Sequence, residues 1–138
     1  MRLTLIPAFT LTVLLTMLST PALAASDLTC TITGVSEISP EGALEALEGK
    51  KNYYETAAGA EFIVQHNTGL MMGRFVNNSG WKISVLDTGS AQNSYKVLAT
   101  RNGGRVQSQF FEVRVQDKGS KKPFVLVATE ILHGYCTQ

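Results

Sequence analysis

The sequence predicts a mainly-β fold: a single antiparallel β-barrel or β-sandwich of about seven or eight strands with one short N-terminal helix, closed by a disulfide bond. Three observations lead to this prediction. Short segments in which apolar and polar residues alternate recur about every ten residues. Turn sequences rich in glycine and asparagine separate these segments. The two cysteines lie near opposite ends of the chain that remains after a predicted signal peptide.

Residues 1–24 have the three parts of a cleavable signal peptide. Arg2 gives a short basic start, residues 3–18 are almost entirely apolar or threonine, and an Ala-Leu-Ala sequence at 22–24 matches the pattern that signal peptidase recognises. The apolar part is shorter than the roughly 20 residues of a membrane-spanning helix, so a membrane anchor is the less favoured alternative. We expect cleavage after residue 24, a single β domain over residues 25–138 and no membrane span after cleavage.

Cys30 and Cys136 are the two cysteines of the chain. In an oxidising compartment, such a pair is expected to form a disulfide bond. The alternatives are a free thiol or a metal-binding pair, and the latter needs more nearby ligands than the sequence supplies. A disulfide bond between these residues places the first and last strands side by side. The sequence therefore predicts a periplasmic or secreted protein.

The first part of the mature chain predicts one strand and one short helix. In residues 28–34, apolar residues alternate with threonines, which is typical of a half-buried strand. Ser39, Pro40 and Glu41 then form a typical helix start, with an N-cap serine, a proline in the first turn and an acidic residue near the positive end. A short apolar stripe follows, and Gly49 ends the predicted helix.

From residue 61 onward, the sequence predicts a β-meander. Its strands are expected at residues 61–66, 70–77, 81–85, 95–99, 107–115 and 124–132. The last of these segments is almost continuously apolar, which is typical of a strand covered on both faces. The turns between the strands contain asparagine and glycine, residues that tolerate positive φ.

Charge is unevenly distributed along the mature chain, whose formal net charge is zero. Residues 25–61 contain seven acidic and two basic residues, and the remainder contains nine basic and four acidic residues, so the two parts carry −5 and +5. A nucleic-acid-binding domain normally has a basic balance, so we expect no nucleic-acid partner. Two interpretations stay open: the acidic part packs beside a basic sheet face, or a basic patch is exposed to an acidic partner.

The sequence Val-Leu-Asp-Thr-Gly-Ser at residues 85–90 resembles the active-site signature of aspartic proteases. The resemblance implies a dimer, because that chemistry needs two such carboxylates that share one proton. The rest of the chain departs from the family, since the motif stands late and the family's second apolar-glycine loop is missing. The same residues form an ordinary turn if Asp87 accepts a hydrogen bond from its own backbone and Gly89 adopts positive φ.

No metal site and no cofactor are predicted. His66, Met71, Met72 and His133 are residue types that bind soft metal ions. The two methionines are adjacent, however, and adjacent side chains point to opposite faces of a strand. No ligand spacing surrounds either histidine, and the chain has neither a nucleophile elbow nor a glycine-rich phosphate loop.

Aromatic and basic residues are the better candidates for ligand binding. The predicted binding residues are Trp81, Arg74, His66, Tyr53 and Tyr54. Tryptophan, tyrosine and arginine are the residue types that most often anchor interfaces, and these residues could line the mouth of a barrel. For Trp81 itself, a place in the core is the favoured interpretation, because it begins an alternating stripe with two aliphatic residues of the following strand.

These observations favour an exported, non-enzymatic, soluble binding module of the bacterial periplasm or exterior. Its expected partner is a protein or a small apolar ligand, held by loops at one end of the barrel or by the basic meander face. One alternative is a small hydrolase, in particular a dimeric aspartic-type protease that uses Asp87. The other is a purely structural envelope protein.

Overall fold

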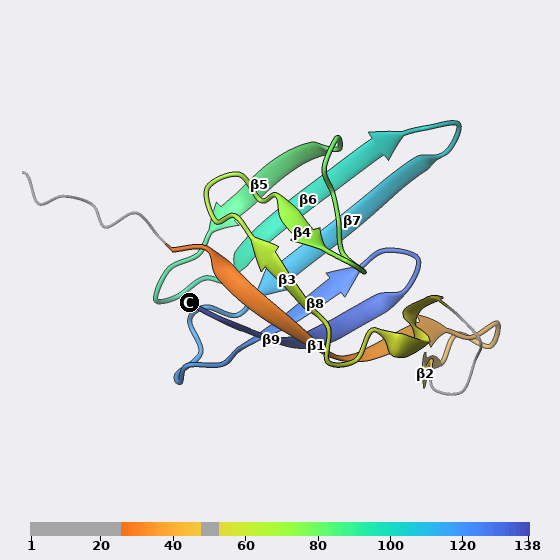
Figure 1. Cartoon of the computed structure of the whole chain (residues 1–138), viewed down its shortest axis with the longest axis horizontal. Helices are drawn as coiled ribbons and strands as arrows, with labels where there is room; N and C mark the ends of the chain where they lie inside the picture. Colours follow the sequence, from red (N-terminus) through yellow and green to blue (C-terminus); the bar gives the residue numbers. More distant parts are fainter. Residues whose placement is uncertain (1–25, 48–52) are drawn as a thin grey trace, which may run out of the picture.

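The computed structural model describes residues 26–47 and 53–138, and the predicted signal peptide at residues 1–24 lies outside these ranges. The described residues form one antiparallel sheet, rolled into a half-barrel (Figure 1). The strands are β1 (Leu28–Ile38), β2 (Leu44–Ala46), β3 (Glu61–Val64), β4 (Met71–Gly73), β5 (Lys82–Thr88), β6 (Tyr95–Asn102), β7 (Val106–Val113), β8 (Lys122–Val127) and β9 (Ile131–Thr137), and a 3-10 turn, η1, spans Tyr53–Thr56. No described helix has the length and apolar character needed to cross a membrane.

The sheet curls so that its two ends face each other. Its strand order is β4-β3-β1-β9-β8-β7-β6-β5, and β2 pairs with β1 beside this path. In Figure 1, β3 and β4 cross in front of β6 and β7. The ring of Phe62 on β3 meets the ring of Phe111 on β7 edge-on, with centroids 5.9 Å apart, and that of Phe124 on β8 at 5.4 Å. Among the described strands, β4 and β5 do not pair, which leaves the half-barrel open on that side.

The centre of the half-barrel is filled by side chains. Phe111 and Tyr95 are fully buried, with ring centroids 6.5 Å apart. Apolar residues from β1, β3, β6, β8 and β9 surround them in a single cluster. Residues 28–32 of β1 and the first part of β6 contribute alternate residues to this cluster, as the period-2 sequence pattern predicts. The predicted mainly-β antiparallel fold is therefore confirmed.

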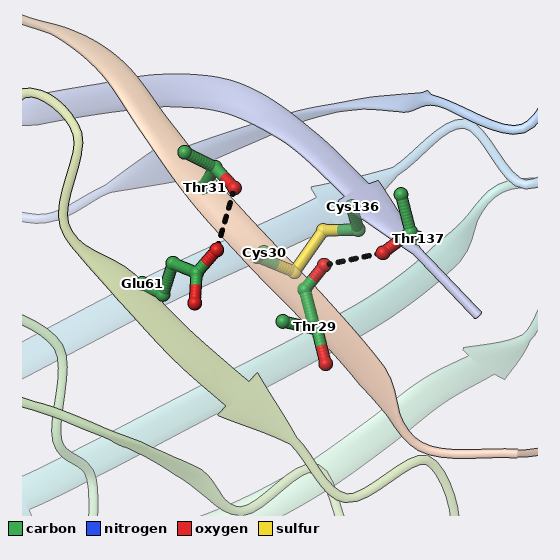
Figure 2. The surroundings of a disulfide bond; sticks show 6 residues. All are labelled: Thr29, Cys30, Thr31, Glu61, Cys136 and Thr137. Carbon is green, nitrogen blue, oxygen red and sulfur yellow. Dashed lines mark hydrogen bonds between the residues drawn. A yellow bond between two sulfur atoms is a disulfide. The ribbon is translucent and has the colours of Figure 1, made fainter.

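A disulfide bond joins the first and last strands. Cys30 and Cys136 are direct partners in the β1–β9 register, and both are fully buried. Figure 2 shows the bond between the two strands, beside the hydrogen bond that the Thr137 hydroxyl donates to the carbonyl oxygen of Thr29 at 3.5 Å. The predicted disulfide and the predicted contact between these strands are thus both confirmed. Such a bond fits an oxidising extracellular or periplasmic compartment.

The short helix predicted from Ser39 onward is not confirmed, because these residues form a β-hairpin. The amide of Gly42 donates to the carbonyl oxygen of Ser39 at 2.8 Å, which closes a turn over Pro40 and Glu41. Gly42 has a φ of 83°, and the chain then returns along β1 as β2. A turn with proline in its second position, followed by a left-handed glycine, is a common three-residue hairpin loop. Pairing with β1 therefore overrides the local helix signals.

The single strand predicted for residues 124–132 is wrong, because this segment contains two strands and a turn. The chain reverses at residues 128–130, where the amide of Ala128 donates to the carbonyl oxygen of Glu130 at 2.9 Å. β8 and β9 then pair with each other, with Val127 opposite Ile131. This division and the short β2 explain why the described sheet has nine strands instead of seven or eight.

Candidate functional site

A cleft of about 620 Å³ lies at the end of the half-barrel where the β6–β7 hairpin projects. It brings together the β6–β7 hairpin, the connection from β4 to β5, the 3-10 turn and the β8–β9 turn, which are distant in the sequence. The lining residues are Tyr54, Arg74, Phe75, Asn77, Trp81, Arg101, Arg105, Val106, Gln107, Ser108, Gln109, Ala128, Thr129 and Glu130. Three predicted binding residues, Trp81, Arg74 and Tyr54, are among them.

Arg101 and Trp81 form the central pair of one wall. Lys82 is the register partner of Thr100, so the preceding Trp81 comes to lie beside Arg101. The guanidinium carbon of Arg101 lies 4.9 Å from the centroid of the Trp81 ring. Its Nη2 and Nε atoms donate to Oε1 of Gln107 at 2.6 and 3.2 Å. These contacts hold a flat cation on the face of an aromatic ring, with further N–H donors still present on the guanidinium.

The connection between β4 and β5, which contains Trp81, belongs to this wall, and Asn78 holds it in place. The Asn78 side chain is fully buried. Its Oδ1 accepts from the amide of Met71 at 2.7 Å, and its Nδ2 donates to the carbonyl oxygen of Gly69 at 3.1 Å. The carbonyl oxygen of Asn78 then accepts from the amide of Trp81 at 3.1 Å. Sequence reasoning identified this turn, but an Asn-Asn-Ser-Gly sequence gives no sign that the second asparagine is buried.

Two aromatic rings and a second arginine continue this wall. The Arg74 guanidinium carbon lies 5.1 Å from the centroid of the Phe75 ring, and the Tyr54 ring is 6.3 Å from that of Phe75. Together with Trp81, these residues line the cleft with alternating aromatic and cationic groups. Such a lining is chemically suited to anions with a flat apolar body, because guanidinium groups bind carboxylate, phosphate or sulfonate oxygens and aromatic rings stack on apolar parts.

Among the described residues, the lining of the cleft is basic, since it contains three arginines and one carboxylate, Glu130. One side-chain atom of the lining residue Gln109 is unsatisfied: its Oε1 is shielded from solvent and has no hydrogen-bond partner among the described residues. A buried acceptor left without a donor costs about 1–3 kcal/mol.

The two other predicted binding residues are Tyr53 and His66. Tyr53 opens the 3-10 turn, but its side chain is outside the described part of the structure. His66 is 7% exposed, and its ring stacks on that of Tyr95 with centroids 4.7 Å apart. The Tyr95 hydroxyl donates to the carbonyl oxygen of His66 at 2.9 Å, and the His66 amide donates to Oδ1 of Asp27 at 3.1 Å. These contacts make His66 part of the packing at the other end of β6.

Burial raises the pKa of Tyr95 from 10.0 to about 12, and the nearby negative charge of Asp27 adds to this effect. The folded state therefore keeps the hydroxyl proton at a pH where the unfolded chain has released it. The contribution of the protonated Tyr95 hydroxyl to the free energy of unfolding is fully present below pH 10. It decreases as pH rises and is absent above pH 12. By pH 11, the lost contribution is about 1.4 kcal/mol.

We expect a Tyr95→Phe variant to be less stable than the wild type at pH 8 by about 1 kcal/mol, because it loses the hydrogen bond to His66. Between pH 8 and pH 11, its free energy of unfolding should fall less than that of the wild type. Urea denaturation of both proteins across this range measures the difference. Equal losses in the two proteins would show that the ionisation of Tyr95 is not coupled to folding.

Asp87 lies in the turn that the sequence allows. Its Oδ1 accepts from the amide of Gly89 at 2.9 Å, and Gly89 has a φ of 75°, so the turn interpretation is confirmed. Met71 is fully buried and Met72 is 40% exposed, as expected for neighbours on a strand. Within residues 26–47 and 53–138, no group of three or more histidine, cysteine, aspartate or glutamate residues is placed to hold a metal ion.

The cleft thus brings together three of the five candidate binding residues of the sequence: Trp81, Arg74 and Tyr54. Comparisons of the chain with protein-family models, with curated proteins and with solved structures gave no match.

Proposed function

We propose that the chain is an exported, non-enzymatic, soluble binding protein of the bacterial periplasm or exterior, and that it holds a negatively charged ligand in the cleft. The observation that carries this proposal is the Trp81–Arg101 pair, which shares the cleft with Arg74 and Arg105. An aromatic face bordered by guanidinium groups suits an anion with a flat or apolar body. The proposal takes up the second interpretation of the charge distribution, in which a basic patch is exposed to an acidic partner.

The packing supports an anionic ligand over a small apolar one. An apolar ligand in a barrel usually occupies the interior, and here Phe111 and Tyr95 fill that space. The cleft instead presents guanidinium, amide and hydroxyl groups beside its aromatic rings. Guanidinium groups stay protonated and amides do not titrate near neutral pH. This lining is suited to holding a ligand rather than to moving protons in a reaction.

Trp81 provides a direct test, because it is the single tryptophan of the chain. The probe is 8-anilinonaphthalene-1-sulfonate, an aromatic anion whose fluorescence rises in an apolar environment. We expect saturable binding with a stoichiometry of one and quenching of Trp81 emission. Replacing Arg101 with glutamine should weaken this binding by about tenfold, the effect of one charge-assisted hydrogen bond.

Lys118→Gln is the matched control, since it removes one positive charge from the loop at the other end of β7. This variant should bind the probe as the wild type does. Circular dichroism of both variants checks that the fold is retained. Equal affinities in the Arg101 and Lys118 variants, or probe binding without quenching of Trp81, would contradict the proposed site.

A further inference from the structure

Half of strand β7 has a free edge. Residues 106–109 pair with β6 on one side, and the pairing with β8 begins only at Phe110, opposite Val127. Figure 1 shows the β6–β7 hairpin reaching past the end of the β8–β9 hairpin. Of the strands that the structure describes, none occupies the other side of residues 106–109. These residues lie along the cleft, so a row of main-chain donors and acceptors is part of its lining.

This edge lacks the features that protect the outer strand β5 from pairing with a further strand. At β5, the register shifts between Val85 and Asp87, which marks an irregularity in the pairing, and Lys82 stands at the start of the strand. Bulges and lysines are the usual means by which edge strands avoid further pairing. Residues 106–109 pair with β6 in a continuous register, and Val106 is 80% exposed. The edge is therefore able to accept another strand.

The free main-chain edge indicates what the ligand must carry. An ionised carboxylate or sulfonate has no donor for the main-chain carbonyl groups of residues 106–109, whereas a polypeptide carries N–H groups along its length. A ligand that supplies only negative charge would satisfy the arginines and leave this edge unpaired.

Charge indicates which polypeptide fits. Arg105 precedes the free edge, Arg101 on β6 lies across from Gln107, and Arg74 also lines the cleft. Of the described residues, Glu130 is the one acidic residue of the lining. A strand laid along residues 106–109 would have these guanidinium groups around it, so acidic side chains are favoured and basic ones are disfavoured.

We infer that the cleft binds an extended acidic segment of a partner protein, which adds as a strand to the free edge of β7 at residues 106–109. The inference rests on the proposed function, because it names the class of anion that the cleft holds. Main-chain hydrogen bonds to the edge provide affinity, and the arginines select for acidic side chains. The exposed Val106 gives the added strand an apolar contact at its end.

The test uses a capped hexapeptide of alternating glutamate and threonine, titrated into the mature protein and followed by calorimetry and by Trp81 fluorescence. A second peptide has the same sequence but carries N-methyl groups on every second amide. It keeps all the charges and loses donors to the strand edge. We expect the first peptide to bind and the methylated peptide to bind at least about tenfold more weakly. In ¹⁵N-labelled protein, the amide signals of residues 106–109 should shift with the first peptide.

Two variants test the contribution of charge, and the methylated peptide tests edge pairing. Arg105→Glu should weaken peptide binding by at least about tenfold, and Lys118→Glu, the same change at the other end of β7, should leave it unchanged.

The outcomes distinguish this inference from the proposed function. If the aromatic sulfonate binds and the hexapeptide does not, or if both peptides bind equally, the strand-addition inference is overturned and the anion site remains. If neither the sulfonate nor the peptide binds, both are overturned. Selective binding of the unmethylated peptide, with shifts confined to the free edge of β7 and the cleft, supports both.

Discussion

A double variant in which Cys30 and Cys136 are both alanine is expected to lose about 4–5 kcal/mol in free energy of unfolding. The two residues are separated by 106 positions, so the bond closes a loop that covers nearly all of the described chain. The chain-entropy account attributes the effect to the unfolded state, which becomes much freer without the cross-link. Domains of this size have total stabilities of about 5–15 kcal/mol, so the variant would be near the limit of folding.

Urea denaturation, followed by Trp81 emission and circular dichroism, measures this loss. The comparison protein is the wild type under reducing conditions, which should unfold at nearly the same urea concentration as the double variant. Both sulfur-bearing side chains are fully buried, so reductant should act only after denaturant opens the fold. A loss below about 1 kcal/mol would show that the disulfide contributes little beyond the pairing of β1 with β9.

Gly134→Ala is expected to cost more than about 4 kcal/mol, which few single substitutions do. Gly134 lies on β9 between β1 and β8, with Ile32 and Phe124 as its register partners. A Cβ atom at this position would overlap the carbonyl oxygen of Thr31 and lie 2.9 Å from the Phe124 ring. The overlap involves main-chain atoms, so a side-chain rotation cannot relieve it and β1 must move away from β9.

Gly103→Ala is the matched control for this substitution. Gly103 lies in the β6–β7 turn, has no positive φ, and a Cβ atom there would meet no atom within 4 Å. The free energy of unfolding of the Gly103→Ala variant should stay within about 0.5 kcal/mol of the wild-type value. The readout is the midpoint of urea unfolding for the two variants side by side. Similar midpoints for both would mean that β1 and β9 adjust to the added methyl group more easily than the packing implies.

The strands could be predicted from the sequence because each buries one face. In β1, Leu28, Cys30 and Ile32 are buried and alternate with more exposed threonines. Turns with glycine or asparagine were also predictable, because positive φ requires them, as at Gly89. The turn between β8 and β9 was missed, since Ala-Thr-Glu contains none of the usual turn residues. The predicted helix failed because a serine-proline start suits a hairpin turn as well as a helix N-terminus.

The candidate site was predictable in its residue types and not in its arrangement. Trp81 could be recognised as a core or interface residue, and the structure places it half-buried at the rim, where it continues the inward stripe of Ile83. Its partner Arg101 stands beside the Asn-Gly-Gly sequence at residues 102–104, and the sequence gives no sign that the two side chains meet. Only the cross-strand register brings those two together. Likewise, the free edge of β7 depends on where β8 ends, which follows from the unpredicted turn at residues 128–130.

Pairing between the first and last strands also has a consequence for when this protein can fold. The sheet reaches its final order only after residues 131–137 have been synthesised, because β9 separates β1 from β8. Contacts between residues so distant in the chain form slowly, typically in milliseconds to seconds. During synthesis, the growing polypeptide therefore lacks its central strand and stays incompletely folded. That delay is compatible with passage through a translocation channel as an extended chain, with oxidation of the two thiols as a late step on the far side.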